Sequence, residues 1–175
     1  MRGLALVIAL GLSATAGAGV VSHGPVPGLA TSDEMTVTVN GEKVWVEAYA
    51  SNFRADQVPD WFLSQEYTRP PQRVNIASFS GAGAMEVEIR ARGPIESYAI
   101  RPASRHIQGT CEGNVLRFRL PGPDKLYIEI KGMAPLCFFA NPPEENVPSA
   151  AGENVVYFGP GVHRPGPITL QDNQT

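Results

Sequence analysis

The chain has 175 residues, with 14 Lys and Arg against 17 Asp and Glu, and a formal net charge of −3 at pH 7. This length suffices for one domain with a hydrophobic core, and the scattered charges exclude a nucleic-acid partner and a polybasic segment for a membrane surface. The 18 Gly and 16 Pro residues are many for a helical protein and favour an all-β domain with frequent turns.

The first 18 residues have the three parts of a secretory signal peptide. Met1 and Arg2 carry positive charge, Leu4–Leu12 is apolar, and Ala16-Gly17-Ala18 has the small-x-small pattern of a cleavage site. A buried helix and a membrane anchor are the alternatives, but the apolar run is too short to span a bilayer. We expect cleavage after Ala18, secretion to the extracellular space, and a flexible Gly/Pro/Ser-rich leader at 19–32.

A β-hairpin is predicted for residues 35–46, because Asn40-Gly41 suits the two positive φ angles of a type I′ turn. A two-residue loop pairs residue 39 with 42, 37 with 44 and 35 with 46. One face of the hairpin then carries Met35, Val37, Val44 and Val46. The other face carries Thr36, Thr38, Lys43 and Trp45.

Short strands are predicted along the middle of the chain. Residues 50–73 are polar and loop-like, and strands follow at 74–79, 85–90 and 97–101. In the second of these strands, apolar and charged residues alternate, so Met85, Val87 and Ile89 are expected to face the core.

A second hairpin is predicted from the alternating residues 116–120 and 126–131. The two apolar sets share a face only if the loop has five residues, Pro121–Lys125, which pairs residue 120 with 126. This register places Arg117 opposite Glu129 as an exposed cross-strand pair.

The apolar run Leu136–Ala140 predicts a strand that is buried on both faces or lies between sheets. No helical periodicity of useful length follows residue 18, so we expect a two-sheet antiparallel β-sandwich over residues 33–145. Residues 146–153 form a connector to a terminal segment at 154–175.

No pattern of catalytic or metal-binding residues stands out. The histidines are isolated and have no metal-ligand spacing; they are His23, His106 and His163. Three acidic pairs could serve as the carboxylates of a glycosidase, and solvated charge is the simpler interpretation. They are Asp33/Glu34, Asp56/Asp60 and Glu144/Glu145. We expect no metal and no cofactor.

Two residue types leave alternatives open. Cys111 and Cys137 could form a disulfide in an oxidising compartment, or they could be buried free thiols, and only geometry decides between these. The rings of Trp61, Tyr67 and Trp45 could stack on a sugar ring, whose C–H face is apolar. Burial of these aromatic side chains against a sheet is the alternative.

The C-terminal third of the chain resembles a known group of secreted enzymes. The stretches 126–130 (LYIEI), 135–144 (PLCFFANPPE) and 156–163 (VYFGPGVH), with 168–170 (ITL), look like a junction in the polygalacturonase-like hydrolases of glycoside hydrolase family 28 and the related dextranase-type enzymes. The stretches 37–41 and 100–102 are similar more loosely. In that group a β-sandwich leads into a right-handed parallel β-helix.

The resemblance implies that 154–175 begins such a β-helix. The catalytic carboxylates of the group lie on later rungs, at positions that have no counterpart in this chain, so no catalytic residue is assigned. The expected role is a non-catalytic accessory domain that caps a downstream β-helix domain, its partner, in an enzyme acting on pectin- or dextran-type polysaccharide. A stand-alone carbohydrate-binding module and a purely structural fragment are the alternatives.

Overall fold

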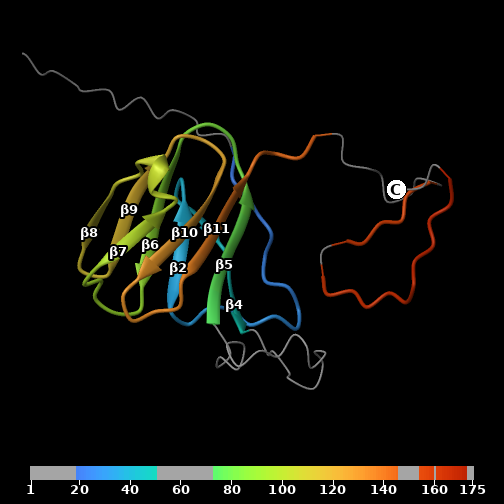
Figure 1. Ribbon diagram of the computed structural model, residues 1–175, viewed down its shortest axis with the longest axis horizontal. Helices are drawn as coiled ribbons and strands as arrows, with labels where there is room; N and C mark the ends of the chain where they lie inside the picture. The colour runs from blue at the N-terminus through green and yellow to red at the C-terminus, as the bar shows by residue number, and fades with distance from the viewer. Residues whose placement is uncertain (1–18, 51–72, 146–153, 160, 173–175) are drawn as a thin grey trace, which may run out of the picture.

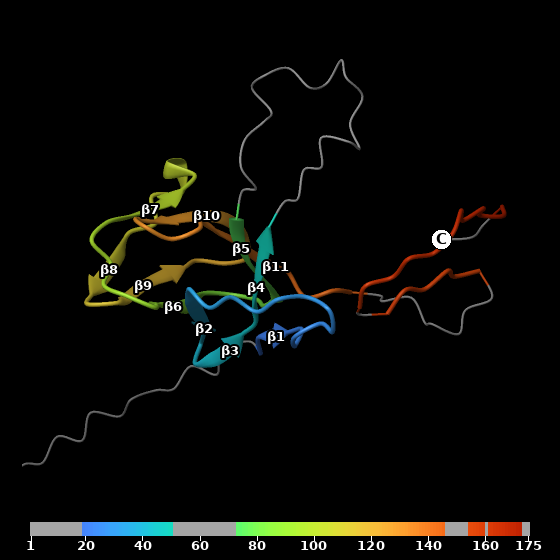
Figure 2. The ribbon, with the colours of Figure 1, turned by 90° about the horizontal axis from the view of Figure 1, so that it is seen from below.

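The computed structural model describes residues 19–50, 73–145, 154–159 and 161–172, and this part of the chain is all-β (Figure 1). Two sheets face each other, as the predicted sandwich requires (Figure 2). A short 3₁₀ turn, η3 (Ala103–Arg105), follows one edge strand. Within the described ranges, no helix has the length and apolar character needed to cross a bilayer.

The first sheet has the strand order β1-β5-β11-β10-β7, with β4 also beside β5. Its strands are β1 (Val21–Ser22), β4 (Val46–Ala50), β5 (Arg73–Ser80), β7 (Tyr98–Arg101), β10 (Asp124–Ile130) and β11 (Leu136–Asn141). The prediction of a wholly antiparallel sandwich is wrong for β5 and β11, which pair in parallel with Leu136 opposite Asn75. Parallel neighbours need a long crossover, and here the chain from β6 to β10 provides it.

The second sheet has the order β3-β2-β6-β9-β8, and all of its pairs are antiparallel. Its strands are β2 (Met35–Val39), β3 (Glu42–Val44), β6 (Met85–Ala91), β8 (Gly109–Glu112) and β9 (Val115–Leu120).

The first hairpin is confirmed over most of its length. Val39 pairs with Glu42 and Val37 with Val44, and the turn residues Asn40 and Gly41 have φ of 51° and 83°. The predicted pairing of 35 with 46 is wrong, because the chain leaves the second sheet at Trp45 and Val46 joins β4 of the first sheet. The four apolar residues predicted to share a face are all buried nevertheless.

The second hairpin is not formed. Strand β9 lies between β6 and β8, whereas β10 lies between β11 and β7 of the other sheet. The apolar sets of the two strands therefore face each other across the core instead of lying on one face. Arg117 is opposite Glu88 and Thr110, and Glu129 is opposite Ala99, so the predicted Arg117–Glu129 pair is wrong.

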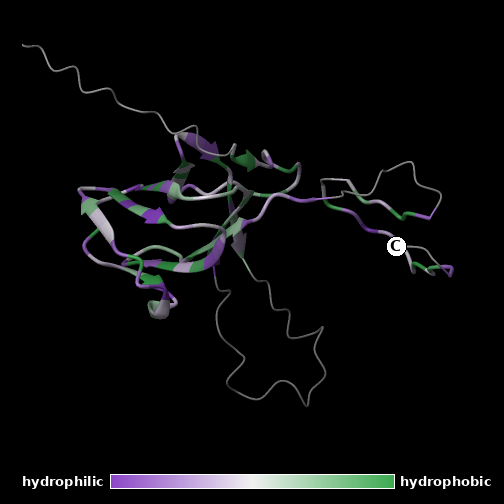
Figure 3. Ribbon diagram, turned by 90° about the horizontal axis from the view of Figure 1, so that it is seen from above, coloured by the Kyte–Doolittle hydropathy of each residue, from purple (hydrophilic) through white to green (hydrophobic). Residues whose placement is uncertain are grey.

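The core lies between the sheets, where hydropathy colouring shows apolar residues alternating with polar ones along the strands (Figure 3). Phe138 is at its centre, with its ring 5.3 Å from that of Phe79 and 6.1 Å from that of Phe118 in edge-to-face arrangements. Strand β11 buries Leu136, Phe138 and Ala140 but leaves its outer face half-exposed. The expectation of burial on both faces thus holds for the inner face alone.

The segment predicted as a flexible leader is partly joined to the sandwich. Val21 and Ser22 pair with the end of β5, Thr31 forms a bridge with Glu47, and the amide of Ser32 donates to the carbonyl of Val46 at 2.8 Å. The predicted signal peptide at 1–18 and the predicted connector at 146–153 lie outside the described residues.

The described residues of the C-terminal segment, 154–159 and 161–172, form no strand. Figure 1 shows this segment away from the two sheets. Its large apolar side chains are open to solvent, with Val156 38%, Phe158 45% and Ile168 49% exposed. The β-helix therefore stays a prediction.

Candidate functional site

Of the three aromatic residues considered for sugar binding, Trp45 lies in the described part of the chain, whereas Trp61 and Tyr67 lie outside it. Trp45 occupies the single position between β3 and β4, at which the backbone passes from one sheet to the other. Its ring is therefore carried at a corner of the sandwich and is only half-buried.

Two hydrogen bonds fix the Trp45 side chain and backbone. The indole Nε1–H donates to Thr31 Oγ1 at 2.9 Å, and the backbone amide donates to Ser22 Oγ at 3.2 Å. Both acceptors belong to the N-terminal segment, which runs beside the β2–β3 hairpin (Figure 2). The orientation of the indole is thus set by the folded chain before any ligand arrives.

The Trp45 cleft is a surface hollow of about 370 Å³ between this N-terminal segment and the hairpin. Met35, Val44 and Val46 contribute apolar surface from the edge of the core. The other lining residues are small, hydroxylic or basic; they are Ser22, Gly24, Pro25, Thr31, Ser32, Thr36 and Lys43. The side of the cleft that carries the Ser and Thr hydroxyls was not predicted from the sequence, because residues 19–32 have no periodic pattern of apolar residues.

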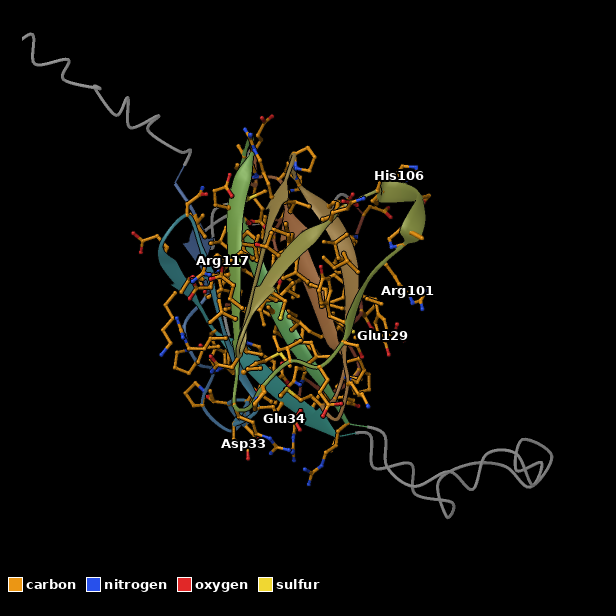
Figure 4. All side chains as sticks on the ribbon, turned by 90° about the vertical axis from the view of Figure 1, so that its left-hand side faces the viewer. Asp33, Glu34, Arg101, His106, Arg117 and Glu129 are labelled. Atoms are coloured by element: carbon orange, nitrogen blue, oxygen red, sulfur yellow. The ribbon has the colours of Figure 1, made fainter. Side chains whose placement is uncertain are left out.

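The acidic pair Asp33/Glu34 lies at one end of the sandwich (Figure 4). Glu34 Oε2 accepts hydrogen bonds from Asn75 Nδ2 at 3.0 Å and from the amide of Ala134 at 2.9 Å. Glu34 Oε1 lies 3.6 Å from Arg92 Nη2, and the Glu34 side chain is 13% exposed. These contacts give the Glu34 carboxylate a structural role. Asp56 and Asp60 lie outside the described residues.

Ion pairs cover the outer faces of the sheets. Glu88 contacts Arg90 and Arg117 at 2.9 Å on the second sheet, and Arg101 contacts Glu129 at 2.7 Å on the first (Figure 4). These side chains are partly exposed to solvent, which screens the charges, so each pair contributes little to stability. Their oppositely charged partners leave no strong single-sign patch on these strands.

The two cysteines are free thiols, so the structure contains no Cys111–Cys137 disulfide. Cys137 lies in the centre of the first sheet and alternates with the buried residues Leu136 and Phe138, which places it on the outer face. Cys111 lies on the edge strand of the other sheet, opposite the buried Leu116. Desolvation by its neighbours raises the pKa of the Cys137 thiol, which favours the unreactive protonated form.

Over the described residues, no group of His, Cys, Asp and Glu side chains could hold a metal ion. His106 has a positive φ of 52° as it ends η3. His163 lies 2.6 Å from the carbonyl oxygen of Gly159 through Nε2, and its ring centroid is 5.4 Å from that of Phe158. His163 thus holds the local turn of the C-terminal segment.

No family model and no curated protein matches the sequence. Among solved structures the chain is similar to Dex49A from Penicillium minioluteum, a dextranase, with a TM-score of 0.53 and 15% identity. The likeness takes in 81% of this chain and 34% of that chain, so the chain spans about a third of the length of Dex49A. At this identity the likeness concerns the fold alone, and Dex49A is a β-helix enzyme, whereas the described part of this chain is a two-sheet β-sandwich in which no β-helix is shown.

Proposed function

We propose that this chain is the non-catalytic N-terminal accessory domain of a secreted hydrolase acting on pectin- or dextran-type polysaccharide. The observation that carries the proposal is the structural likeness to part of Dex49A. The sequence resemblance at residues 126–170 points to the same group of enzymes, independently of the structural likeness.

The partner in this proposal is a downstream β-helix domain. The end of a β-helix exposes backbone donors and an apolar cross-section, which must be covered to prevent edge-to-edge association. Solvent-exposed Val156, Phe158 and Ile168 supply apolar side chains that such a domain would bury. The sandwich would then serve as a cap and these residues as the connection to it.

The test is the activity of the chain by itself. Purified residues 19–175 should release no reducing ends from polygalacturonate or dextran above the rate of a protein-free blank. Circular dichroism typical of β-structure confirms that the sample is folded. Hydrolysis that copurifies with the folded chain and persists at high purity would refute a non-catalytic role.

Binding of polysaccharide at the Trp45 cleft is a second candidate function, favoured by the fixed, half-exposed indole beside hydroxyl side chains. Flat aromatic rings combined with a few placed polar groups are typical of small-ligand sites. In native gels containing polysaccharide, the chain should be retarded, and Trp45→Ala should abolish the retardation. Tyr127→Ala is the matched control, since Tyr127 is 39% exposed on the outer face of the other sheet.

A further inference from the structure

We infer that the Trp45 cleft binds a sugar ring that carries a carboxylate, namely a uronic acid unit of an acidic polysaccharide. This inference rests on the second candidate function and adds the class of sugar. It follows from the balance of hydrogen-bond donors, acceptors and charges that line the cleft.

The indole supplies an apolar platform of fixed orientation. Its N–H is already bonded to Thr31 Oγ1 at 2.9 Å, so the ring has no donor left for a ligand and offers its π-face and edge. A sugar ring that packs on it needs no reorientation of Trp45, and a pre-organised contact loses less conformational entropy on binding.

The hydroxyl groups of the cleft retain donors for a ligand. Ser22 Oγ and Thr31 Oγ1 each accept a hydrogen bond from Trp45, and Ser32 Oγ accepts one from the amide of Glu34 at 3.1 Å. A hydroxyl that accepts such a bond keeps its own O–H to donate. Among the described residues, no hydrogen bond uses the O–H of these three side chains.

Charge adds to this excess of donors. Lys43 lines the cleft, is exposed, and makes no ion pair with any described residue. By contrast, Lys131 and Arg101 on the first sheet are each paired with a glutamate. Of the residues that the structure describes, no Asp or Glu lines the cleft, and both carboxylate oxygens of nearby Glu34 are engaged elsewhere.

A ligand for such a site must be rich in acceptors and negatively charged. The carboxylate of a uronic acid accepts hydrogen bonds through two oxygens and pairs with an ammonium group, and such charge-assisted bonds are stronger than neutral ones. A neutral glucan offers only hydroxyl and ether oxygens and leaves Lys43 without a counter-charge. The cleft therefore favours the acidic sugar.

The test uses intrinsic fluorescence with trigalacturonate as the probe. The chain has two tryptophans, so Trp61→Phe leaves Trp45 as the single reporter. Trigalacturonate should change the Trp45 emission in a saturable way, and Lys43→Ala should weaken this binding about tenfold, the effect of one charge-assisted hydrogen bond. Lys125→Ala, which removes an exposed lysine on the other sheet, should leave the affinity unchanged.

Three results would overturn the inference. Equal affinity for isomaltotriose would show that the cleft takes neutral sugar, and would leave carbohydrate binding itself intact. Equal weakening by Lys125→Ala would show nonspecific charge attraction. Absence of any binding to a chain with native circular dichroism would reject both the inference and the second candidate function.

A second readout avoids substitution of either tryptophan. In the unmodified protein labelled with ¹⁵N, trigalacturonate should shift the indole N–H resonance of Trp45, and Thr31→Val should move that resonance in the absence of ligand. A titration that shifts other resonances but leaves this one unchanged would place the ligand elsewhere and contradict the inference.

Discussion

At the scale of single residues, Glu34 connects parts of the described fold that lie far apart in the sequence. Its carboxylate joins β5, through Asn75, to the turn before β11, through Ala134, and it does so from the residue that precedes β2 of the opposite sheet. Asn75 is itself only 2% exposed. The Glu34 side chain therefore connects the two sheets at one end of the sandwich.

Glu34→Ala should lower the free energy of unfolding by about 2–3 kcal/mol, because it leaves the Ala134 N–H and one of the two Asn75 Nδ2–H groups without an acceptor. Asn75 Nδ2 keeps its other bond, to the carbonyl oxygen of Ala134 at 3.1 Å. Urea denaturation followed by fluorescence measures the change. Glu86→Ala is the matched control, because the side chains of Glu86 and of its ion-pair partner Arg119 are 73% and 71% exposed. Its loss of unfolding free energy should stay below about 0.5 kcal/mol. Similar losses for both variants would contradict the role assigned to Glu34.

This role could not be predicted from the sequence. In the sequence, Asp33 and Glu34 are simply two adjacent acidic residues. The hydrogen-bond donors to Glu34 lie 41 and 100 residues further along the chain. The sequence singled out Trp45 through its ring, but the hydroxyls that orient it belong to a segment with no periodic pattern. Contacts of this kind depend on tertiary structure alone.

At the scale of elements, most strands were predictable, but outside the first hairpin their partners were not. Alternation of apolar residues located β6 and the inward faces of β9 and β10, because burial of one face imposes a period of two. The same alternation is satisfied whether two strands lie side by side or face each other across a core. That ambiguity explains why β9 and β10 were expected to form a hairpin and instead belong to different sheets.

The Asn40-Gly41 turn was predictable because its chemistry is local. Gly41 has φ of 83° and no neighbouring atom would touch an added Cβ, so Gly41→Ala should cost about 1 kcal/mol through backbone strain alone. Thermal denaturation of both variants tests this, with Gly93→Ala as control. Gly93 also has open space around it but no positive φ, so its variant should be near neutral, and an equal effect would reject the assignment to the turn.

At the scale of the whole molecule, the sandwich and the C-terminal segment differ in how they are stabilised. The sandwich buries a continuous core between two sheets, whereas the described residues 154–159 and 161–172 form no strand and expose their apolar side chains. The all-β class and the sandwich were predictable from composition and strand spacing. The parallel pair of β5 and β11 was not, because no local pattern encodes where a distant strand inserts.

Removal of residues 146–175 should leave the sandwich intact. The midpoint of thermal unfolding should change by less than about 4 °C, the shift that about 1 kcal/mol produces in a domain of this size. Differential scanning calorimetry of the shortened and full chains measures it. A larger decrease would mean that the C-terminal segment packs on the sandwich and contributes to its stability.

The pairing of β5 with β11 also determines when the protein can fold. Strand β5 lies between β4 and β11. The hydrogen bond from the Ala134 amide to Glu34 likewise joins residues that are 100 positions apart. During synthesis, the first sheet therefore lacks a central strand until Asn141 has left the ribosome. Such distant pairings slow folding and expose strand edges in the meantime. Until Asn141 has emerged, the edge of β5 that pairs with β11 must stay unfolded or protected, and the first sheet is completed only afterwards.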